Sequence, residues 1–121
     1  ARPEADLAQL ATRALQKRAL THFGGRLVHY TDRLELETPK LALSSAHTRW
    51  GSCSKHGGIR LNWRLIHLPT HLGDYVVAHE VAHMLEMNHS ARFWTVVSSL
   101  YPEWKAARAE LKQRATSMPI L

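Results

Sequence analysis

The sequence predicts an α+β fold in which one helix is followed by a small antiparallel sheet and then by a run of further helices. Three observations predict it. Apolar residues recur at helical spacing near the N-terminus, alternate with polar residues in the middle of the chain, and return to helical spacing after Pro69. A chain of 121 residues that is 45% hydrophobic and 21% charged can bury one core. We therefore expect a single domain, residues 1–121.

The first predicted element is an amphipathic helix that begins at Pro3 and extends to about Phe23. Its apolar residues are spaced by three and four positions, as one face of a helix requires. Gly24-Gly25 follows this pattern, and glycine is the residue found most often just beyond the end of a helix. We expect the helix to end there.

Short antiparallel strands are predicted between Arg26 and Leu68, where apolar residues alternate with polar or small ones. The alternating pairs are Leu34/Leu36, Leu41/Leu43 and Ile59/Leu61. Turns between the strands are expected at Thr38-Pro39, at Gly51 and at Gly57-Gly58, since proline and glycine favour turns.

Three helices are predicted after Pro69. Thr70 can cap the first, and residues 72–87 are apolar nearly all the way round, which is typical of a buried helix. Ser90 can cap the second helix. Pro102 can open the third, because proline fits the first turn of a helix.

The composition excludes several classes of protein. One cysteine excludes a disulfide framework and any zinc site built with two or more cysteines, so imidazole and carboxylate groups would have to hold a metal. No apolar run approaches the ~18 residues of a membrane span, and charges near the N-terminus leave no apolar core for a signal peptide. We therefore expect a cytoplasmic protein with no membrane partner.

The buried helix contains the run His79-Glu80-Val81-Ala82-His83. Residues four apart on a helix lie about 40° apart around its axis and ~6 Å along it, so the two imidazoles can converge on one ion. Glu80 lies beside them, where it can hold a water molecule on that ion. The alternative is a pair of core histidines, but burying these groups in an apolar helix without a ligand would be costly. The run therefore indicates a metal site.

A catalytic zinc ion usually has three protein ligands and one open position, so a third ligand is expected. His89 has the spacing of the extended motif His-Glu-x-x-His-x-x-Gly-x-x-His, whereas Glu103 has the spacing of the thermolysin-like proteases. His89 can reach the ion only if the helix breaks first, and Asn88 and Ser90 favour such a break. A carboxylate at Glu103 is also explained by the dipole of the helix it begins. We favour His89 as the third ligand. Glu86 is a candidate to hydrogen-bond to one of the ligands without binding the metal itself.

Four blocks of the sequence resemble the YgjP-like metallopeptidase domain: Arg49–Ser54, Gly58–Ile66, Asp74–Glu80 and Asn88–Trp94. The resemblance implies a minimal zincin fold with Zn²⁺ bound by His79, His83 and His89, and with Glu80 as the general base. More distantly, the spacing is similar to WLM-type and SprT-like proteases, which act on proteins crosslinked to DNA. Family members often carry extra N-terminal sequence, so the chain is expected to be the C-terminal, catalytic part of a longer protein.

Four further residues are candidates for binding substrate. Tyr75 lies one helical turn before His79, so its hydroxyl can stabilise an oxyanion unless the ring serves only for packing. Arg49 begins a glycine-containing segment that can contact substrate or phosphate, or form a plain hairpin turn. Asn62 belongs to a strand that is expected at the sheet edge above the metal, where a peptide can add as a further strand. Arg92 is a candidate to hold phosphate.

Three functions follow from these observations. The leading hypothesis is a zinc-dependent metallopeptidase that acts on a peptide or protein through a zinc-bound water, with Glu80 as general base. The second is a nucleotide pyrophosphatase acting on UTP with the same zinc site, an activity given to some relatives. The third is a nucleic-acid-binding module with structural zinc, suggested by the net charge of +6 and by basic residues on the first and last helices. Structural zinc is normally closed by a fourth protein ligand, which argues against the third.

Overall fold

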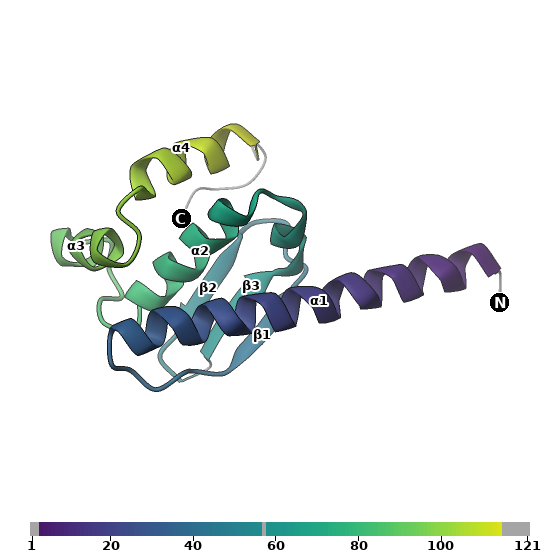
Figure 1. Cartoon of the computed structure of the whole chain (residues 1–121), viewed down its shortest axis with the longest axis horizontal. Coiled ribbons are helices and arrows are strands. Elements are labelled where there is room, and N and C mark those ends of the chain that lie inside the picture. Colours follow the sequence, from purple (N-terminus) through teal and green to yellow (C-terminus); the bar gives the residue numbers. More distant parts are fainter. Residues whose placement is uncertain (1–2, 57, 115–121) are drawn as a thin grey trace.

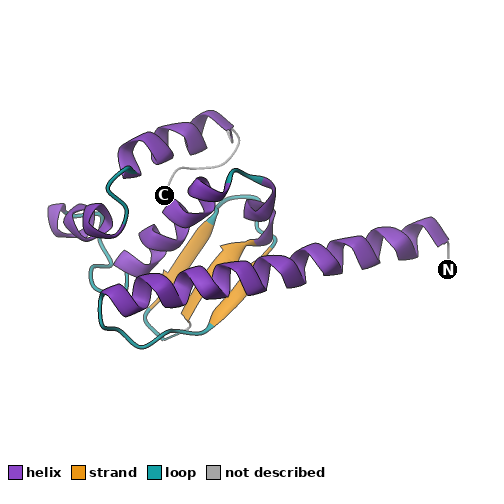
Figure 2. Ribbon diagram, in the orientation of Figure 1, coloured by secondary structure: helices purple, strands orange, loops and turns teal. Residues whose placement is uncertain are grey.

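The computed structural model describes residues 3–56 and 58–114, and these form an α+β fold, as predicted (Figure 1). The elements are α1 (Pro3–Arg33), β1 (Leu41–Ser44), β2 (Gly51–Ser54), β3 (Gly58–Asn62), the 3-10 helix η1 (Trp63–His67), α2 (Thr70–Ala82), α3 (Ala91–Leu100) and α4 (Trp104–Arg114). The α1 helix crosses in front of the sheet in Figure 2, and α2 packs against both α1 and β2.

The sheet has three strands in the order β1-β3-β2. β2 pairs with β3 in the antiparallel sense, with Gly51 opposite Leu61, but β1 pairs with β3 in parallel, with Leu41 opposite Ile59. The expectation of a purely antiparallel sheet was therefore wrong for one of the two pairings. The chain crosses from β1 to the far edge before the β2–β3 hairpin turns back, which gives β3 the direction of β1.

α1 does not end at Gly24-Gly25 but continues to Arg33. The apolar side chains that α1 buries are Ala19, Phe23, Leu27 and Tyr30, so its packing stripe runs across the two glycines. This packing outweighs the helix penalty of ~1 kcal/mol for each glycine. The half of α1 that precedes Ala19 extends beyond the rest of the domain (Figure 1), and Leu7 and Leu10 are exposed there.

The actual end of α1 explains why Leu34 and Leu36 are not in a strand. Glu35 has a positive φ of 57°, and the backbone N–H groups of Glu35 and Leu36 donate to the carbonyls of Asp32 and Thr31 at 3.0 Å each. These two bonds form a Schellman motif, which closes a helix by satisfying its last carbonyls. The alternation of leucines there belongs to a helix terminus.

An ion pair joins α1 to α2. Arg26 Nε and Nη2 donate to Asp74 Oδ1 and Oδ2 at 3.0 and 2.8 Å, and the Tyr30 hydroxyl donates to Oδ2 at 3.2 Å. The hydrogen bonds to the Asp74 carboxylate raise the pKa of the Arg26 guanidinium, although burial opposes the shift. This bidentate contact fixes the long helix against the helix that carries the predicted metal motif.

α2 differs from its prediction at both ends. Its N-cap is Pro69, with no side-chain hydrogen bond, so Thr70 does not cap it, and the helix ends at Ala82 instead of continuing to residue 87. The later helices agree better with the sequence. Ser90 caps α3 by accepting a hydrogen bond from the Phe93 N–H, and α4 begins shortly after Pro102. Within the described ranges, no helix has the length and hydropathy to cross a membrane.

Candidate metal centre

α2, which is buried along most of its length, carries His79 and Glu80, and His83 is its C-cap residue. The exposed fractions of the three residues are 0%, 1% and 9%. The last turn of the helix therefore presents two imidazoles and a carboxyl group to a space almost free of solvent. Such burial is costly unless the groups bind a ligand or one another.

His89 completes a group of three histidines because α2 ends early. After Ala82 the chain forms a turn in which the N–H groups of Met84 and Leu85 donate to the carbonyls of Val81 and Ala82. The chain then reverses direction. His89 Nε2 consequently lies 3.2 Å from His83 Nε2. Had the helix continued, His89 would point away from His83.

The spacing of the three imidazoles suits one metal ion. One ring nitrogen from each of His79, His83 and His89 lies within 4.8 Å of the other two. Bonds of ~2.0–2.1 Å around a tetrahedral ion would place such nitrogens roughly 3.4 Å apart. Within the described ranges no carboxylate joins this cluster, and Glu103 is exposed in the turn before α4. The donor set therefore fits a metal ion held by three imidazoles.

His83 is oriented from behind by the main chain of Glu86. Its Nδ1 lies 3.0 Å from the Glu86 carbonyl oxygen, which can act only as a hydrogen-bond acceptor. Nδ1–H as donor leaves the Nε2 lone pair directed at the other two histidines. The sequence singled out Glu86 for such support, and the structure provides it through the peptide carbonyl. Burial lowers the pKa of His83, which favours the neutral form that binds metals.

Aromatic side chains from α3 and α4 pack against the cluster on one side, while His89 stays exposed. Phe93 stacks on His83 with ring centroids 4.4 Å apart, and Trp94 stacks on His89 at 5.9 Å. Trp104 stacks in turn on Trp94 at 4.4 Å. Reasoning from the sequence did not assign these aromatic residues to the site. The signal available was Ser90, because its cap fixes where α3 begins and so which residues face the histidines.

Glu80 is buried beside the cluster. Its Oε2 lies 3.5 Å from His79 Nδ1 and has no hydrogen-bond partner among the described residues. Burial raises the pKa of Glu80 to about 7, although the positive potential of His83, His89 and Arg49 opposes the shift. A carboxyl group with this pKa can take up and release a proton near neutral pH.

A cavity of about 220 Å³ opens in front of Glu80. Arg49, Gly51, Ser52 and Cys53 line one side of it, and Glu80, His83, Met87 and His89 line the other. Strand β2 therefore forms a wall of the cavity, and Arg49 lies where the sequence expected a substrate contact. Burial and the charge of Glu80 raise the pKa of Cys53, which keeps it a thiol and unsuited to be a nucleophile.

The other predicted substrate residues lie outside this cavity. Tyr75 is fully buried with its ring 5.9 Å from that of His79, and burial raises the pKa of its hydroxyl to about 12. Asn62 is buried and bonds to backbone: its Nδ2 donates to Ala46 O at 2.8 Å and its Oδ1 accepts from Arg64 N at 3.0 Å. Its strand, β3, is central, and the edge strand beside the histidines is β2. Arg92 is exposed on α3.

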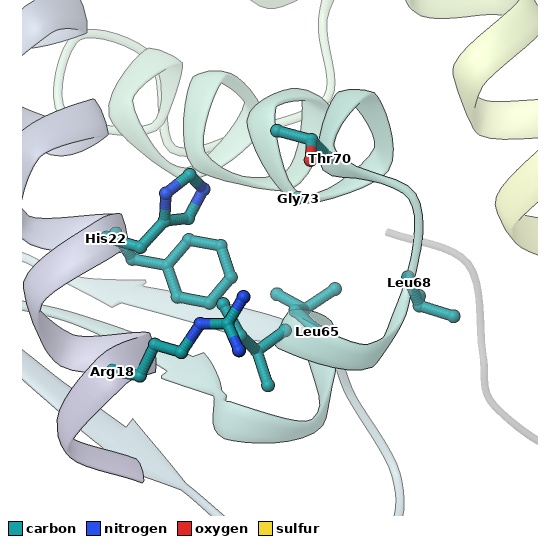
Figure 3. A pocket seen from close by; sticks show the side chains of 8 residues that line it. Arg18, His22, Leu65, Leu68, Thr70 and Gly73 are labelled. Carbon is teal, nitrogen blue, oxygen red and sulfur yellow. The ribbon is translucent and has the colours of Figure 1, made fainter. Parts of the chain in front are cut away.

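A separate cavity of about 230 Å³ lies between α1, η1 and the start of α2 (Figure 3). Arg18 and His22 of α1 face it from one side, and Thr70 and Gly73 of α2 from the other. None of these residues belongs to the predicted site.

The three histidines beside a buried carboxyl group are an arrangement found in metal-dependent hydrolases. More particularly, residues 1–114 match the family model described as YgjP-like, metallopeptidase domain, and the chain belongs to this family. This confirms the resemblance seen in the sequence and extends it to the N-terminal helix.

Comparison with solved structures agrees with this fold. The chain is similar to the crystal structure of the metallopeptidase zymogen of Pyrococcus abyssi abylysin, with a TM-score of 0.72 and 24% identity. The match covers 82% of this chain and 99% of that chain. No curated protein matches the sequence. At this identity the comparison supports the architecture, and the chemistry must be argued from the side chains.

Proposed function

We propose that the chain is a zinc-dependent peptidase in which His79, His83 and His89 hold the metal and Glu80 is the general base. The observation that carries the proposal is the juxtaposition of three imidazole nitrogens within 4.8 Å of one another with a buried carboxyl oxygen that lacks a hydrogen-bond partner in the described structure. Glu80, His83 and His89 line a cavity that a substrate can enter.

Zinc is the metal that this donor set favours. Three neutral imidazoles, one of them supported by a backbone carbonyl, are typical ligands of a catalytic zinc site with an open fourth position. When bound, zinc acts as a Lewis acid and lowers the pKa of a water molecule at the open position toward ~7.

The side chains of the cavity then have distinct tasks. Glu80 accepts the proton of the water that attacks the scissile carbonyl carbon, and it delivers that proton to the amine as the C–N bond breaks. Its position at the cavity beside the histidines allows both transfers. Arg49 contributes positive charge at the mouth of the cavity, where it can attract the polarised carbonyl oxygen.

The position of β2 favours a peptide substrate. β2 pairs with β3 on one side only, and its residues line the cavity. An extended peptide can pair with the main chain of an exposed strand, which would lay a peptide bond across the cavity. Arg49 is also the feature that suits the second candidate, hydrolysis of the phosphoanhydride of UTP, because guanidinium groups bind phosphate well.

The test is a substrate screen of the zinc-loaded chain with an unfolded protein, a library of quenched fluorescent peptides, and UTP. We expect peptide hydrolysis that falls on the order of 10²–10⁴-fold in Glu80→Gln at unchanged zinc content. The matched control is Glu103→Gln, which should keep its activity because Glu103 is exposed and lies outside the histidine cluster. Peptide hydrolysis that is equal in the wild type and Glu80→Gln would contradict the proposal, and Glu80-dependent release of pyrophosphate without peptide hydrolysis would establish the second candidate.

A further inference from the structure

A larger cavity, of about 490 Å³, adjoins the cavity at the histidine cluster. The two cavities share Cys53, His83 and Met87 as lining residues. The larger one lies between the segment that leads into β1, the β2–β3 hairpin and the turn that follows α2. Its volume lies within the range of ligand-binding cavities and suits one large side chain with its neighbour.

One side of this cavity is apolar and open to solvent. Met84, Leu85 and Met87 come from the turn after α2, and Leu85 and Met87 are 49% and 51% exposed. Large apolar side chains left exposed beside a reactive site indicate a surface that a partner covers. Methionine side chains are flexible, so they can adapt to apolar groups of different shape.

The opposite side of the cavity is basic. It carries Lys40, Lys55 and His56, all exposed, and no Asp or Glu lies among the described residues that line it. Gly58 allows the hairpin to pack closely against Lys40. Its φ is +80°, and a Cβ there would lie 2.4 Å from the Lys40 carbonyl oxygen. The Ile59 N–H donates to the same carbonyl at 2.9 Å. The position of Lys40 relative to the hairpin is therefore set by the backbone.

We propose that this cavity, called here the basic-rimmed pocket, is a specificity pocket that receives a large apolar side chain next to the scissile bond. The rim formed by Lys40, Lys55 and His56 holds a carboxylate that follows this side chain in the substrate. The carboxylate comes either from an acidic residue or from the C-terminus of the peptide. The inference rests on the proposed peptidase function, because it places the pocket beside the bond that is cut.

The experiment measures peptide binding separately from cleavage. Fluorescent peptides that differ only in one pair of residues, Phe-Glu, Phe-Lys or Ser-Glu, are titrated into the zinc-loaded Glu80→Gln chain, each as a free acid and as a C-terminal amide. We expect Phe to bind about 10-fold more tightly than Ser, and Glu about 3- to 10-fold more tightly than Lys, with the charge preference weakening as salt rises. A charge preference retained in the amides assigns the carboxylate to a side chain, and one confined to the free acids assigns it to the C-terminus.

Two pairs of substitutions test the location of the pocket. Lys40→Glu with Lys55→Glu should invert the charge preference, whereas Lys17→Glu with Lys112→Glu, which makes the same change of net charge at exposed positions of α1 and α4, should leave it intact. Leu85→Ser should reduce the preference for Phe. Thermal unfolding checks that each variant is folded.

The outcomes separate the two proposals. Preferences that are the same in the Lys40/Lys55 variant as in its control would overturn the pocket, even if the wild type cleaves peptides. If the preference inverts as expected but the wild type shows no Glu80-dependent cleavage, the peptidase assignment fails, and with it the placing of the pocket beside a cut bond.

Discussion

Replacing Gly51 with alanine is expected to disturb both the fold and the proposed general base. A Cβ at Gly51 would lie 3.0 Å from Glu80 Oε2, 3.1 Å from Glu80 Cγ and 3.2 Å from Leu61 Cδ2. Both neighbours are fully packed, with exposed fractions of 1% for Glu80 and 0% for Leu61. Neither side chain can swing into solvent, so the added methyl group must push them within the core.

The cost can be bounded from similar overpacking of protein cores, about 1–3 kcal/mol. A domain of this size loses about 3–5 °C in melting temperature for each kcal/mol, so Gly51→Ala should melt roughly 3–15 °C below the wild type. Glu80 must shift by a few tenths of an ångström. A misplacement of ~1 Å can cost 10²-fold, so a shift of a few tenths should reduce hydrolysis about 4- to 10-fold while zinc content stays the same.

The matched control is Gly25→Ala. A Cβ at Gly25 meets nothing within 4 Å, and the residue lies inside α1, where alanine is favoured by about 0.5–1 kcal/mol. This variant should melt about 2–5 °C above the wild type and keep its activity. The assay is thermal unfolding with zinc analysis and peptide hydrolysis on both variants. Wild-type stability and activity in Gly51→Ala would refute the close packing of β2 on Glu80, and a destabilised Gly25→Ala would refute a continuous α1.

Three further outcomes are expected. Asp74→Ala should lower the free energy of unfolding by about 1–2 kcal/mol in urea denaturation, because it removes the bidentate contact with Arg26; equal stability would show that the pair contributes nothing. Trp104→Leu should weaken zinc binding about 10-fold in a chelator competition, since it removes the support of the aromatic stack that ends on the third histidine, and Trp104→Phe should restore it. Hydrogen bonds from His71 and Arg114 lower the pKa of Glu110, so its contribution to stability is present above the unfolded value of 4.5 and is lost as pH falls through the folded value. In Glu110→Gln the free energy of unfolding should therefore fall less steeply as the pH is lowered, which acid unfolding followed by circular dichroism measures. Identical curves for the variant and the wild type would count against the ion pair.

Local rules of sequence predicted the order of the elements better than their boundaries. Ser90 caps α3 through its own side chain, and the buried face of α2 is visible in its composition. The length of α1 could not be predicted in this way, because contacts with α2, distant in sequence, hold Gly24 and Gly25 in a helix. The parallel pairing of β1 was hidden for the same reason: alternation marks a strand but not its neighbour.

In the candidate site, too, local features could be predicted from the sequence and contacts between distant segments could not. The spacing of His79 and His83 within one helix was enough to predict that they converge, and the need for a helix break predicted how His89 could join them. The support of His83 by the Glu86 carbonyl could not be foreseen in detail, because every residue has a carbonyl. Asn62 was expected at a sheet edge beside the metal, but its strand, β3, is central. The side chain of Asn62 caps the 3-10 helix η1.

The most direct test of the account is a zinc titration of the metal-free chain and of His89→Ala, followed by calorimetry or by competition with a chelator. Three imidazoles that share one ion predict one zinc per chain in the wild type, and a loss of affinity of at least about 100-fold when the third imidazole is removed from its position 3.2 Å from His83. No stoichiometric zinc in the wild type, or equal affinity in His89→Ala, would contradict the central claim that these three histidines form one metal site.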